Sequence, residues 1–447
     1  MRSSFFTLVI LCNLISNYVL AEEQSVQQPS LILELPLADY PFNGIDGYTA
    51  PSMQQSLNIT KNFYQYGHYK FDEWYADDPT GRMLSIVAFD VITTWLPFGD
   101  AWLHEEWHRA VMSHRNVDSY NEVYDLPLFA DTISVKDVRD EDLVRLKADH
   151  PADMVRMHAA GLEAQNELNF SLEKDQFFNK TQTFDQVLIW LNYLNNIGYL
   201  HTCASNESNR ITDELMEEEG QDISERDFTG LDCNAWVYDL FRPDEPYAAR
   251  GVHPSGVGIR RYIKYADLTT EEQDYLETNA RLSFLNLVNP FLLNQRSFLG
   301  TNPFNDKPMQ WNASLRHHLT SFGYSIEANL FLKQDTTNIM LIWRNYFNKD
   351  HHFPGLELAL YRLPVNFFGA RLPVTVRAAI WQQPKDQLFT TSESEQGGLA
   401  GIKLHIPWTR QMESYFEVET KSHGWVAGNV YLEPETSYRF GIAAHLF

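Results

Sequence analysis

Cysteine, basic residues and long apolar segments are all scarce in this sequence, and each scarcity excludes a class of protein. Only 3 of the 447 residues are cysteine. The 35 lysines and arginines are outnumbered by 59 aspartates and glutamates, and the net charge of −24 argues against nucleic acid as a partner and for an acidic surface outside the cytoplasm. Beyond the N-terminus, no stretch has the roughly 18 consecutive apolar residues that a spanning helix requires.

The N-terminus has the pattern of a secretory signal over residues 1–21. A basic residue precedes a mostly apolar run, and a small-residue cleavage site ends at Ala21. Cys12 lies inside this removable segment, and the mature chain is long enough for two or three domains. The two other cysteines, Cys203 and Cys233, fit either one disulfide closing a loop of about 31 residues or two free thiols.

The most informative motif is His104-Glu105-Glu106-Trp107-His108. It lies in an amphipathic segment, residues 100–114, that predicts a helix with Asp100 as its N-cap. On a helix the two histidines lie one above the other on the same face, where both can bind one metal ion. Glu105 projects beside that face and can deprotonate a metal-bound water. The alternative is a helix whose histidines are half-buried packing residues.

This H-E-x-x-H arrangement resembles the zincin family of zinc metallopeptidases over the residues of the motif alone. The resemblance implies a zinc ion held by His104 and His108, with Glu105 as the general base in peptide-bond hydrolysis. The longer pattern H-E-x-x-H-x-x-G-x-x-H is not met, because neither its glycine nor its last histidine falls at the expected place in residues 109–114.

A catalytic zinc takes a third protein ligand, and the sequence offers two glutamates for it. In gluzincins this ligand is a glutamate on a later helix. Glu163 is the favoured candidate, because the small residues 159–161 would let its helix approach the histidine helix closely. Glu167, which follows Asn166 in a pair similar to that of gluzincins, is the alternative. Either can instead be an exposed helix carboxylate.

Two further features of the sequence bear on such a site. A tetrahedral oxyanion needs a hydrogen-bond donor besides zinc, and His158, His253 and Tyr262 are open candidates. Residues 213–227 are rich in carboxylates, which is typical of a solvated loop or an exposed helix. We therefore assign this acidic run neither a catalytic role nor a calcium site.

The chain after the signal segment divides into three parts. Residues 22–78 carry several prolines and turn signals and are predicted to be irregular. Residues 79–305 show helical periodicity, including a core helix over residues 83–96 and a helical region broken near Pro151. Residues 309–447 have the alternating pattern of β-strands.

The β-region consists of strand-like runs joined by short turns. The runs are residues 311–319, 322–332, 337–347, 355–363, 370–382, 397–408, 413–421, 424–432 and 437–447. With the signal segment and the terminal Phe447, they resemble a bacterial outer-membrane barrel of about eight strands. The expected fold class is therefore α+β, a mainly helical zincin-like domain followed by an antiparallel β-barrel.

Two features depart from the usual barrel pattern. Phe447 is out of phase with the apolar residues of the last run, and Pro373 and Pro407 lie inside predicted strands, where each removes a hydrogen-bond donor. A periplasmic sandwich, or a sheet packed on the helical domain, is the alternative.

Together the motif and the strand pattern predict a zinc metallopeptidase of the bacterial outer membrane, whose helical domain faces the periplasm or the cell surface. Its predicted partners are a protein or peptide substrate and outer-membrane lipid, without nucleic acid. One alternative is a barrel-anchored binding or assembly protein without catalytic activity. Another is a soluble periplasmic metallopeptidase.

Overall fold

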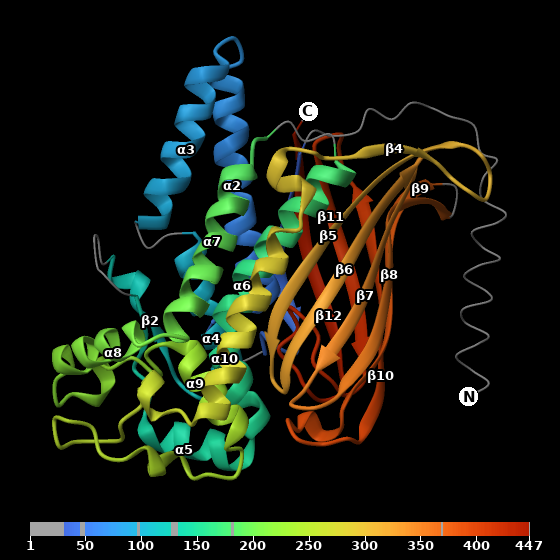
Figure 1. The fold of residues 1–447 in the computed structure, drawn as a ribbon. Helices are drawn as coiled ribbons and strands as arrows, with labels where there is room; N and C mark the ends of the chain where they lie inside the picture. Colours follow the sequence, from blue (N-terminus) through green and yellow to red (C-terminus); the bar gives the residue numbers. More distant parts are fainter. Residues whose placement is uncertain are drawn as a thin grey trace.

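The computed structural model describes residues 31–44, 50–95, 99–126, 133–179, 183–367 and 370–446. Their fold is mixed α+β: a large curved antiparallel sheet stands beside a layer of helices (Figure 1). The predicted signal segment, residues 1–21, and the terminal Phe447 lie outside the described residues. No helix within the described ranges is both long and apolar enough to cross a membrane.

The helical layer follows the predicted periodicity closely. Among the described residues its α-helices are α2 (Met53–Trp74), α3 (Pro79–Trp95), α4 (Asp100–His114), α5 (Asp140–Asp149), α6 (Pro151–Phe178), α7 (Gln186–Cys203), α8 (Glu207–Glu218), α9 (Asp232–Phe241) and α10 (Thr270–Leu282). The predicted helix over residues 100–114 is confirmed, although Gly99 and not Asp100 is its N-cap. The break near Pro151 is also confirmed, because this proline takes the first position of α6, where no N–H is needed.

Within the described ranges, ten strands form one antiparallel sheet in the order β1-β12-β11-β10-β9-β8-β7-β6-β5-β4. They are β1 (Leu31–Tyr40), β4 (Phe298–Thr301), β5 (Pro308–Thr320), β6 (Gly323–Gln334), β7 (Thr337–Phe347), β8 (His352–Phe367), β9 (Ala370–Pro384), β10 (Ser394–Pro407), β11 (Met412–Lys421) and β12 (Glu435–Leu446). A separate ribbon pairs β2 (Tyr120–Asn121) with β3 (Val135–Lys136). All predicted runs but one are confirmed as strands. The exception, residues 424–432, is a loop in which Gly424 and Gly428 have positive φ.

Two predictions about the architecture are wrong. Residues 22–78 are not irregular throughout, since they contain β1 and α2; Pro36 is tolerated in β1 because that strand lies at a sheet edge. The sheet is also not closed into an eight-stranded barrel, because the edge strands β1 and β4 do not pair with each other.

Helices and their connections cover β1 on one side of the sheet and, on the other side, the part of β5 that runs on past the short edge strand β4. Beside β1, the side chain of Asn62 on α2 donates to a backbone carbonyl of that strand at 2.7 Å. On β5, beyond the short β4, the N–H of Leu315 donates to Val288 O at 3.0 Å, and Trp236 Nε1 donates to Thr320 O at 3.0 Å. These edge groups are satisfied by helices and their connections instead of by further strands.

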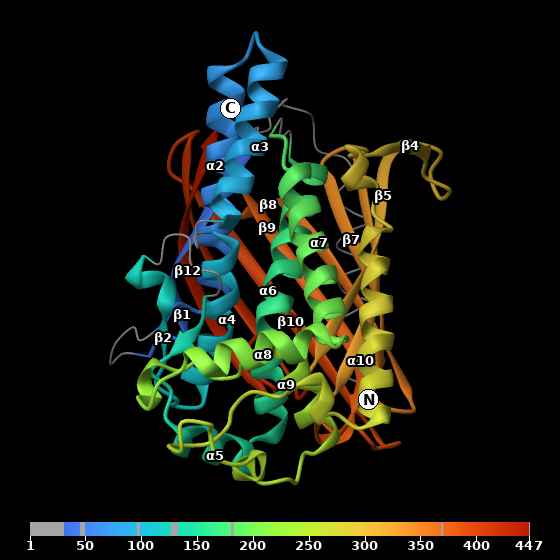
Figure 2. The same cartoon turned by 60° about the vertical axis from the view of Figure 1, so that its left-hand side comes forward.

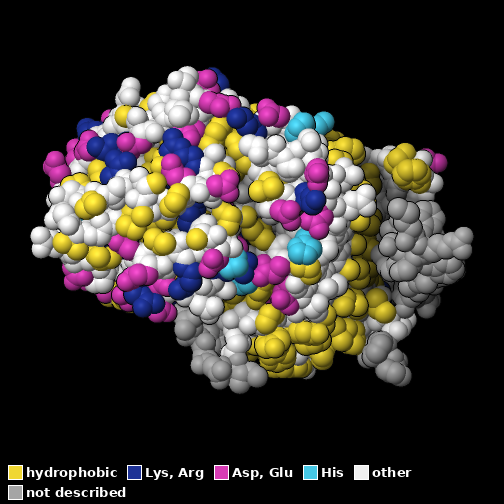
Figure 3. Space-filling view, turned by 90° about the horizontal axis from the view of Figure 1, so that it is seen from below, with side chains coloured by type: hydrophobic (Ala, Val, Ile, Leu, Met, Phe, Trp, Pro, Cys, Tyr) yellow, Lys and Arg dark blue, Asp and Glu magenta, His cyan; other side chains and the backbone are white. Residues whose placement is uncertain are grey.

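The sheet reverses the usual distribution of side chains. Its inner face carries a ladder of alternating charges, to which Glu167 of α6 adds the first carboxylate by binding Arg316. The members on the sheet are Arg316, Glu327, Arg344, Glu357, Arg377, Glu419, Arg439 and Asp39. Its outer face is apolar and open, with Trp343 61% and Ile380 67% exposed. Figure 3 shows hydrophobic side chains gathered on the side of the sheet, whereas charged side chains are concentrated over the helical layer.

Candidate metal centre

Helix α4 carries the two histidines of the H-E-x-x-H motif into the interior. Leu103, Trp107 and Ala110 anchor the helix in the main hydrophobic core. The opposite margin of the helix then presents His104 and His108 one turn apart, with ring centroids 4.9 Å from each other. The side chain of His108 is buried, and that of His104 is 16% exposed. The metal-binding face predicted for this helix is therefore present.

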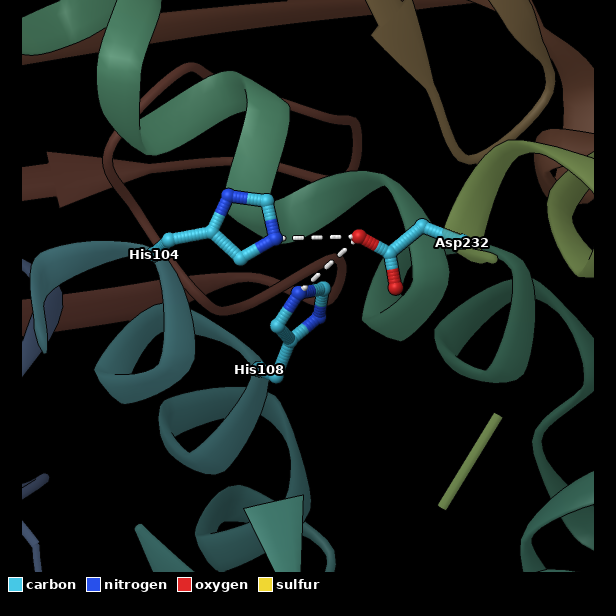
Figure 4. Close-up of side chains that lie close together, drawn as sticks. All are labelled: His104, His108 and Asp232. Carbon is cyan, nitrogen blue, oxygen red and sulfur yellow. Dashed lines mark hydrogen bonds and ion pairs between the residues drawn. The ribbon is translucent and has the colours of Figure 1, made fainter. Parts of the chain in front are cut away.

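A carboxylate from α9 joins the two histidines. Asp232, the first residue of α9, places Oδ2 3.0 Å from His104 Nε2 and 3.4 Å from His108 Nε2 (Figure 4). One ligand atom from each of these residues lies within 4.8 Å of the other two. Two imidazoles and one carboxylate form a donor set typical of catalytic zinc, so the residues fit this ion.

Helix α6 lies against the cluster and orients both histidines. His108 Nδ1 pairs with the carbonyl oxygen of Met157 at 2.5 Å, which leaves Nε2 as the nitrogen free for a metal. One turn further along α6, Gly161 lies against His104, and a Cβ at this position would come within 2.2 Å of His104 Nε2. The prediction that small residues let α6 approach the histidine helix closely is thereby confirmed.

Glu163, the predicted third ligand, lies in a different network. Its Oε1 accepts a hydrogen bond from Arg156 of the same helix at 2.9 Å. It accepts a second one from the N–H of Gly428, in the loop after β11, also at 2.9 Å. Glu163 comes two residues after Gly161, about 200° further round the helix, so it faces the sheet instead of α4. Because its side chain points away from the two histidines, Glu163 is not the third ligand that the sequence predicted.

The alternative ligand, Glu167, is also occupied elsewhere. It binds Arg316 on β5 at 2.8 Å and belongs to the charge ladder of the sheet. Asp232 replaces both glutamates as the candidate third ligand. Sequence reasoning missed Asp232 because no ligand motif surrounds it, and the only signal was the adjacent Cys233.

The sequence allowed either a disulfide or two free thiols for Cys203 and Cys233, and the structure contains the disulfide. The Cys203–Cys233 bond joins the end of α7 to the first turn of α9, directly after Asp232. One turn before Cys203, the Tyr199 hydroxyl oxygen accepts a hydrogen bond from the Asp232 N–H at 3.0 Å. Asp232 is therefore held in place by two links to α7.

The two glutamates of the motif have different surroundings. Glu106 is fully buried and satisfied, because Arg109 binds it at 2.7 Å and Asn121 and Tyr124 donate to it, each at 2.9 Å. Glu105 is also buried, yet it has no hydrogen bond or ion pair with the described residues. Glu106 therefore stabilises α4, whereas the Glu105 carboxylate is free to act on a ligand.

Burial and neighbouring carboxylates control protonation around the cluster. Burial raises the pKa of Glu105 well above its usual value, and Asp232 and Asp227 add to this effect. Burial also lowers the pKa of His104, which favours the neutral imidazole that binds metals. The pKa of Asp232 lies well below its usual range, since His108 and His104 outweigh the opposing effect of burial. The pKa of His108 is raised, because the charge of Asp232 outweighs burial. The centre thus holds an ionised carboxylate between a neutral imidazole, His104, and one whose protonated form is favoured, His108, so a metal would displace that proton.

The three predicted oxyanion donors are engaged elsewhere. Both ring nitrogens of His158 are occupied, by Asp239 and Thr229, each at 2.9 Å. Both His253 and Tyr262 bind the carboxylate of Glu219. His253 Nε2 lies 3.1 Å from its Oε2, and the Tyr262 hydroxyl donates to its Oε1 at 2.5 Å. Glu219 belongs to the acidic run 213–227, which sequence analysis interpreted as solvated and which in fact contributes this partly buried group.

Tyr199 is a further candidate donor, which sequence analysis missed. Its ring lies 6.4 Å from that of His104, measured between centroids. Because its oxygen already accepts the Asp232 N–H, its own proton is available to a further acceptor. The amino-acid sequence places Tyr199 in a predicted helix but gives no other sign of this role.

A second group with metal-binding side chains, Glu34, His405 and Glu413, is already neutralised by cations. Lys403 binds Glu34, and Arg362 binds Glu413 at 2.7 Å. The centre formed by His104, His108 and Asp232 has no Lys or Arg ion pair among the described residues and is the better candidate. In comparisons with known proteins, no family model, curated protein or solved structure matches this chain.

Proposed function

We propose that this protein is a zinc-dependent hydrolase of peptide bonds. The observation that carries the proposal is the juxtaposition of His104, His108 and Asp232 with Glu105, a buried carboxylate without a partner in the described residues. A catalytic zinc site combines three protein ligands of these types with a nearby base. The substrate would be a protein or a peptide, as in the zincins that the motif resembles.

The chemistry follows from what each side chain offers. Zinc held by the three ligands would supply a Lewis acid and an acidified water. Glu105 accepts the proton of the attacking water and returns it to the leaving amine, a role that suits a carboxylate with a raised pKa. The Tyr199 hydroxyl donates to the oxyanion that develops on the attacked carbonyl.

Metal content tests the ligand set. The purified protein should contain about one zinc per chain, and the His104→Ala/His108→Ala and Asp232→Ala variants should lose it. Glu163→Ala is the matched control, because this equally buried carboxylate lies outside the cluster, and it should keep its zinc. Wild-type protein that takes up no zinc when zinc is offered would favour the alternative, a binding or assembly protein without catalytic activity.

The role of Tyr199 requires a kinetic test. Tyr199→Phe removes the proton that would stabilise the oxyanion, so kcat should fall by about 10²-fold at unchanged KM and unchanged zinc content. A loss of zinc without a lower turnover per bound zinc would instead assign Tyr199 to the positioning of Asp232 alone.

We also propose an outer-membrane location, as the strand pattern predicted. The support is the reversed sheet. Cross-strand neighbours on its outer face, from β9 to β12, are Val376, Ile402, Val418 and Tyr438, without a charge among them. Apolar residues outside and charges inside are the pattern of membrane strands. Retention in outer-membrane fractions after a high-salt wash is expected, and release by osmotic shock would refute this location.

A further inference from the structure

We propose that helices α2, α3 and α7 complete the lipid-facing surface that the open sheet leaves unfinished. In this arrangement the acyl chains of the bilayer contact one continuous belt made partly of strands and partly of helices. The inference rests on the proposed outer-membrane location and goes beyond it, because it names which helical surfaces enter the lipid.

The first argument concerns the edges of the sheet. An unpaired strand edge is not tolerated in hydrocarbon, so an open sheet can lie there only if other groups satisfy its edges. Asn62 Nδ2 and Gln55 Nε2 of α2 donate to the carbonyl oxygens of Glu34 and Pro36 on β1, at 2.7 and 3.5 Å. Pro36 has no N–H to satisfy. The helix thus acts as the next element after β1.

On the opposite side of the sheet, the part of β5 that runs on past the short edge strand β4 is covered in the same way. Along β5, the His317 N–H donates to Asn286 Oδ1 at 2.6 Å, and the His317 carbonyl accepts from Asn166 Nδ2 of α6 at 3.3 Å. The N–H of Leu315 is bound by Val288 O. Strand β1 and most of β5 therefore border the helical layer, which lies in front of the sheet in Figure 2.

The second argument is that these helices, like the sheet, carry charged side chains on their inner faces and apolar side chains on their outer faces. Their charges turn inward: Lys61 of α2 binds Asp175 at 2.9 Å, and the fully buried His68 lies between Asp90 of α3 and Asp185, at 2.6 and 2.7 Å. A helix that faced water would place such groups on its outer side.

Apolar side chains make up most of the outer faces instead, with Asn195 on α7 as an exposed polar exception. The apolar side chains are Ile59 and Phe63 on α2, Leu84 and Ile92 on α3, and Leu194 on α7, each 40% exposed or more. The segment of α7, QVLIWLNYLNNIGYLHTC, contains no Lys, Arg, Asp or Glu. A helix with such a composition on a water-facing surface is unusual, whereas the acyl chains of lipid would match it.

Helix α8 shows what a water-facing helix of this protein looks like. Its Arg210 binds both Glu207 and Glu214, and all three side chains are more than half exposed. The tip between α2 and α3 is similar, since Lys70 and Glu73 form an exposed pair there and Trp74 is 69% exposed. Charges with aromatic residues are typical of the interface between lipid and water, so the belt ends at this tip.

Nitroxide labels placed one at a time on the full mature chain test the belt. The positions are Leu194→Cys on α7, Ile92→Cys on α3, Ile380→Cys on the outer face of the sheet, and Glu214→Cys on α8 as the water-facing control. All four side chains are exposed, so the labels should not disturb packing, and near-ultraviolet circular dichroism checks the fold of each labelled protein. The vesicles contain phosphatidylcholine and phosphatidylglycerol, and relaxation is measured with oxygen and with a water-soluble nickel chelate.

Oxygen should relax the labels at 194, 92 and 380 several-fold more than the nickel chelate does, and the label at 214 should show the reverse. If position 380 is in lipid while 194 and 92 are in water, the helical belt is refuted and the outer-membrane location stands. If 380 is also in water, the location itself fails and the belt fails with it.

Discussion

The charge ladder of the sheet and the candidate metal centre are both buried and polar, but only one of them is complete. In the ladder every carboxylate meets an arginine: Glu327, for example, lies between Arg316 and Arg344. Within the described part of the chain, Glu105 of the metal centre has no such partner, and the carboxylate of Asp232 forms ion pairs with two histidines alone. Completed networks specify structure, whereas a buried ionisable group without a partner indicates where a ligand binds. The predictions below test that distinction.

The largest effect should come from Glu105. Glu105→Gln removes the base without changing the size of the side chain, so hydrolysis of a peptide substrate should fall by about 10²–10⁴-fold while zinc content is kept. The neighbouring Glu106→Gln is the matched control. It weakens the ion pair with Arg109 and should lower stability, but the activity per folded molecule should persist. Equal losses of activity in both variants would contradict the assignment of Glu105.

Interrupting the ladder should affect stability alone. Glu327→Leu leaves Arg316 and Arg344 buried without this partner, which should cost about 3–5 kcal/mol of the free energy of unfolding. Denaturant unfolding in detergent measures this change. Zinc content should be unaffected, because Glu327 lies outside the metal cluster. Loss of zinc from folded Glu327→Leu protein would show that the two polar regions are coupled and that the comparison is wrong.

The local pattern of the sequence predicted much of this structure, because short-range periodicity determines single elements. Helix α4 and the helix start at Pro151 follow from apolar spacing and from the lack of an N–H in proline. The pairing of β1 with β12 could not be predicted in this way. Asp39 and Arg439, which bind each other there, are 400 residues apart, and no periodicity reports a contact over that distance.

Short-range periodicity also explains why only part of the metal centre could be predicted. His104, Glu105 and His108 lie within one helical turn or so, so their geometry follows from the helix alone. The third ligand depends on how α6 and α9 are rotated against α4. Gly161 faces α4 and Glu163 therefore does not, and this rotation is set by packing that the sequence does not display.

Gly161 offers a finer test of the same contact. In Gly161→Ala the added methyl group would meet the ring of His104, so this ligand must shift and zinc affinity should fall by about 10–100-fold. Competition with a chelator measures the affinity. Gly198→Ala on α7 is the control, because a Cβ there has no heavy atom within 4 Å and should leave zinc binding unchanged. Unchanged affinity in Gly161→Ala would show that His104 binds zinc in another position.

The smallest predicted effect is a pH dependence of the zinc-free protein. Burial raises the pKa of Asp227 to about 7, and Asp232 and Glu219 add to the effect. The folded state therefore holds a proton that the unfolded state, with a pKa near 3.8, releases. The resulting stabilisation is complete below about pH 4, declines as pH rises, and is lost above about pH 7.

Between pH 5 and pH 8 the Tm of zinc-free wild-type protein should therefore fall by a few degrees more than that of Asp227→Asn, which carries no titrating group at this position. Zinc should reduce the difference, because a bound cation offsets the negative charge that Asp227 gains beside Asp232. A difference that zinc leaves unchanged would mean that Asp227 does not sense the metal. The groups that respond to the metal would then be Glu105 and the three ligands, without Asp227.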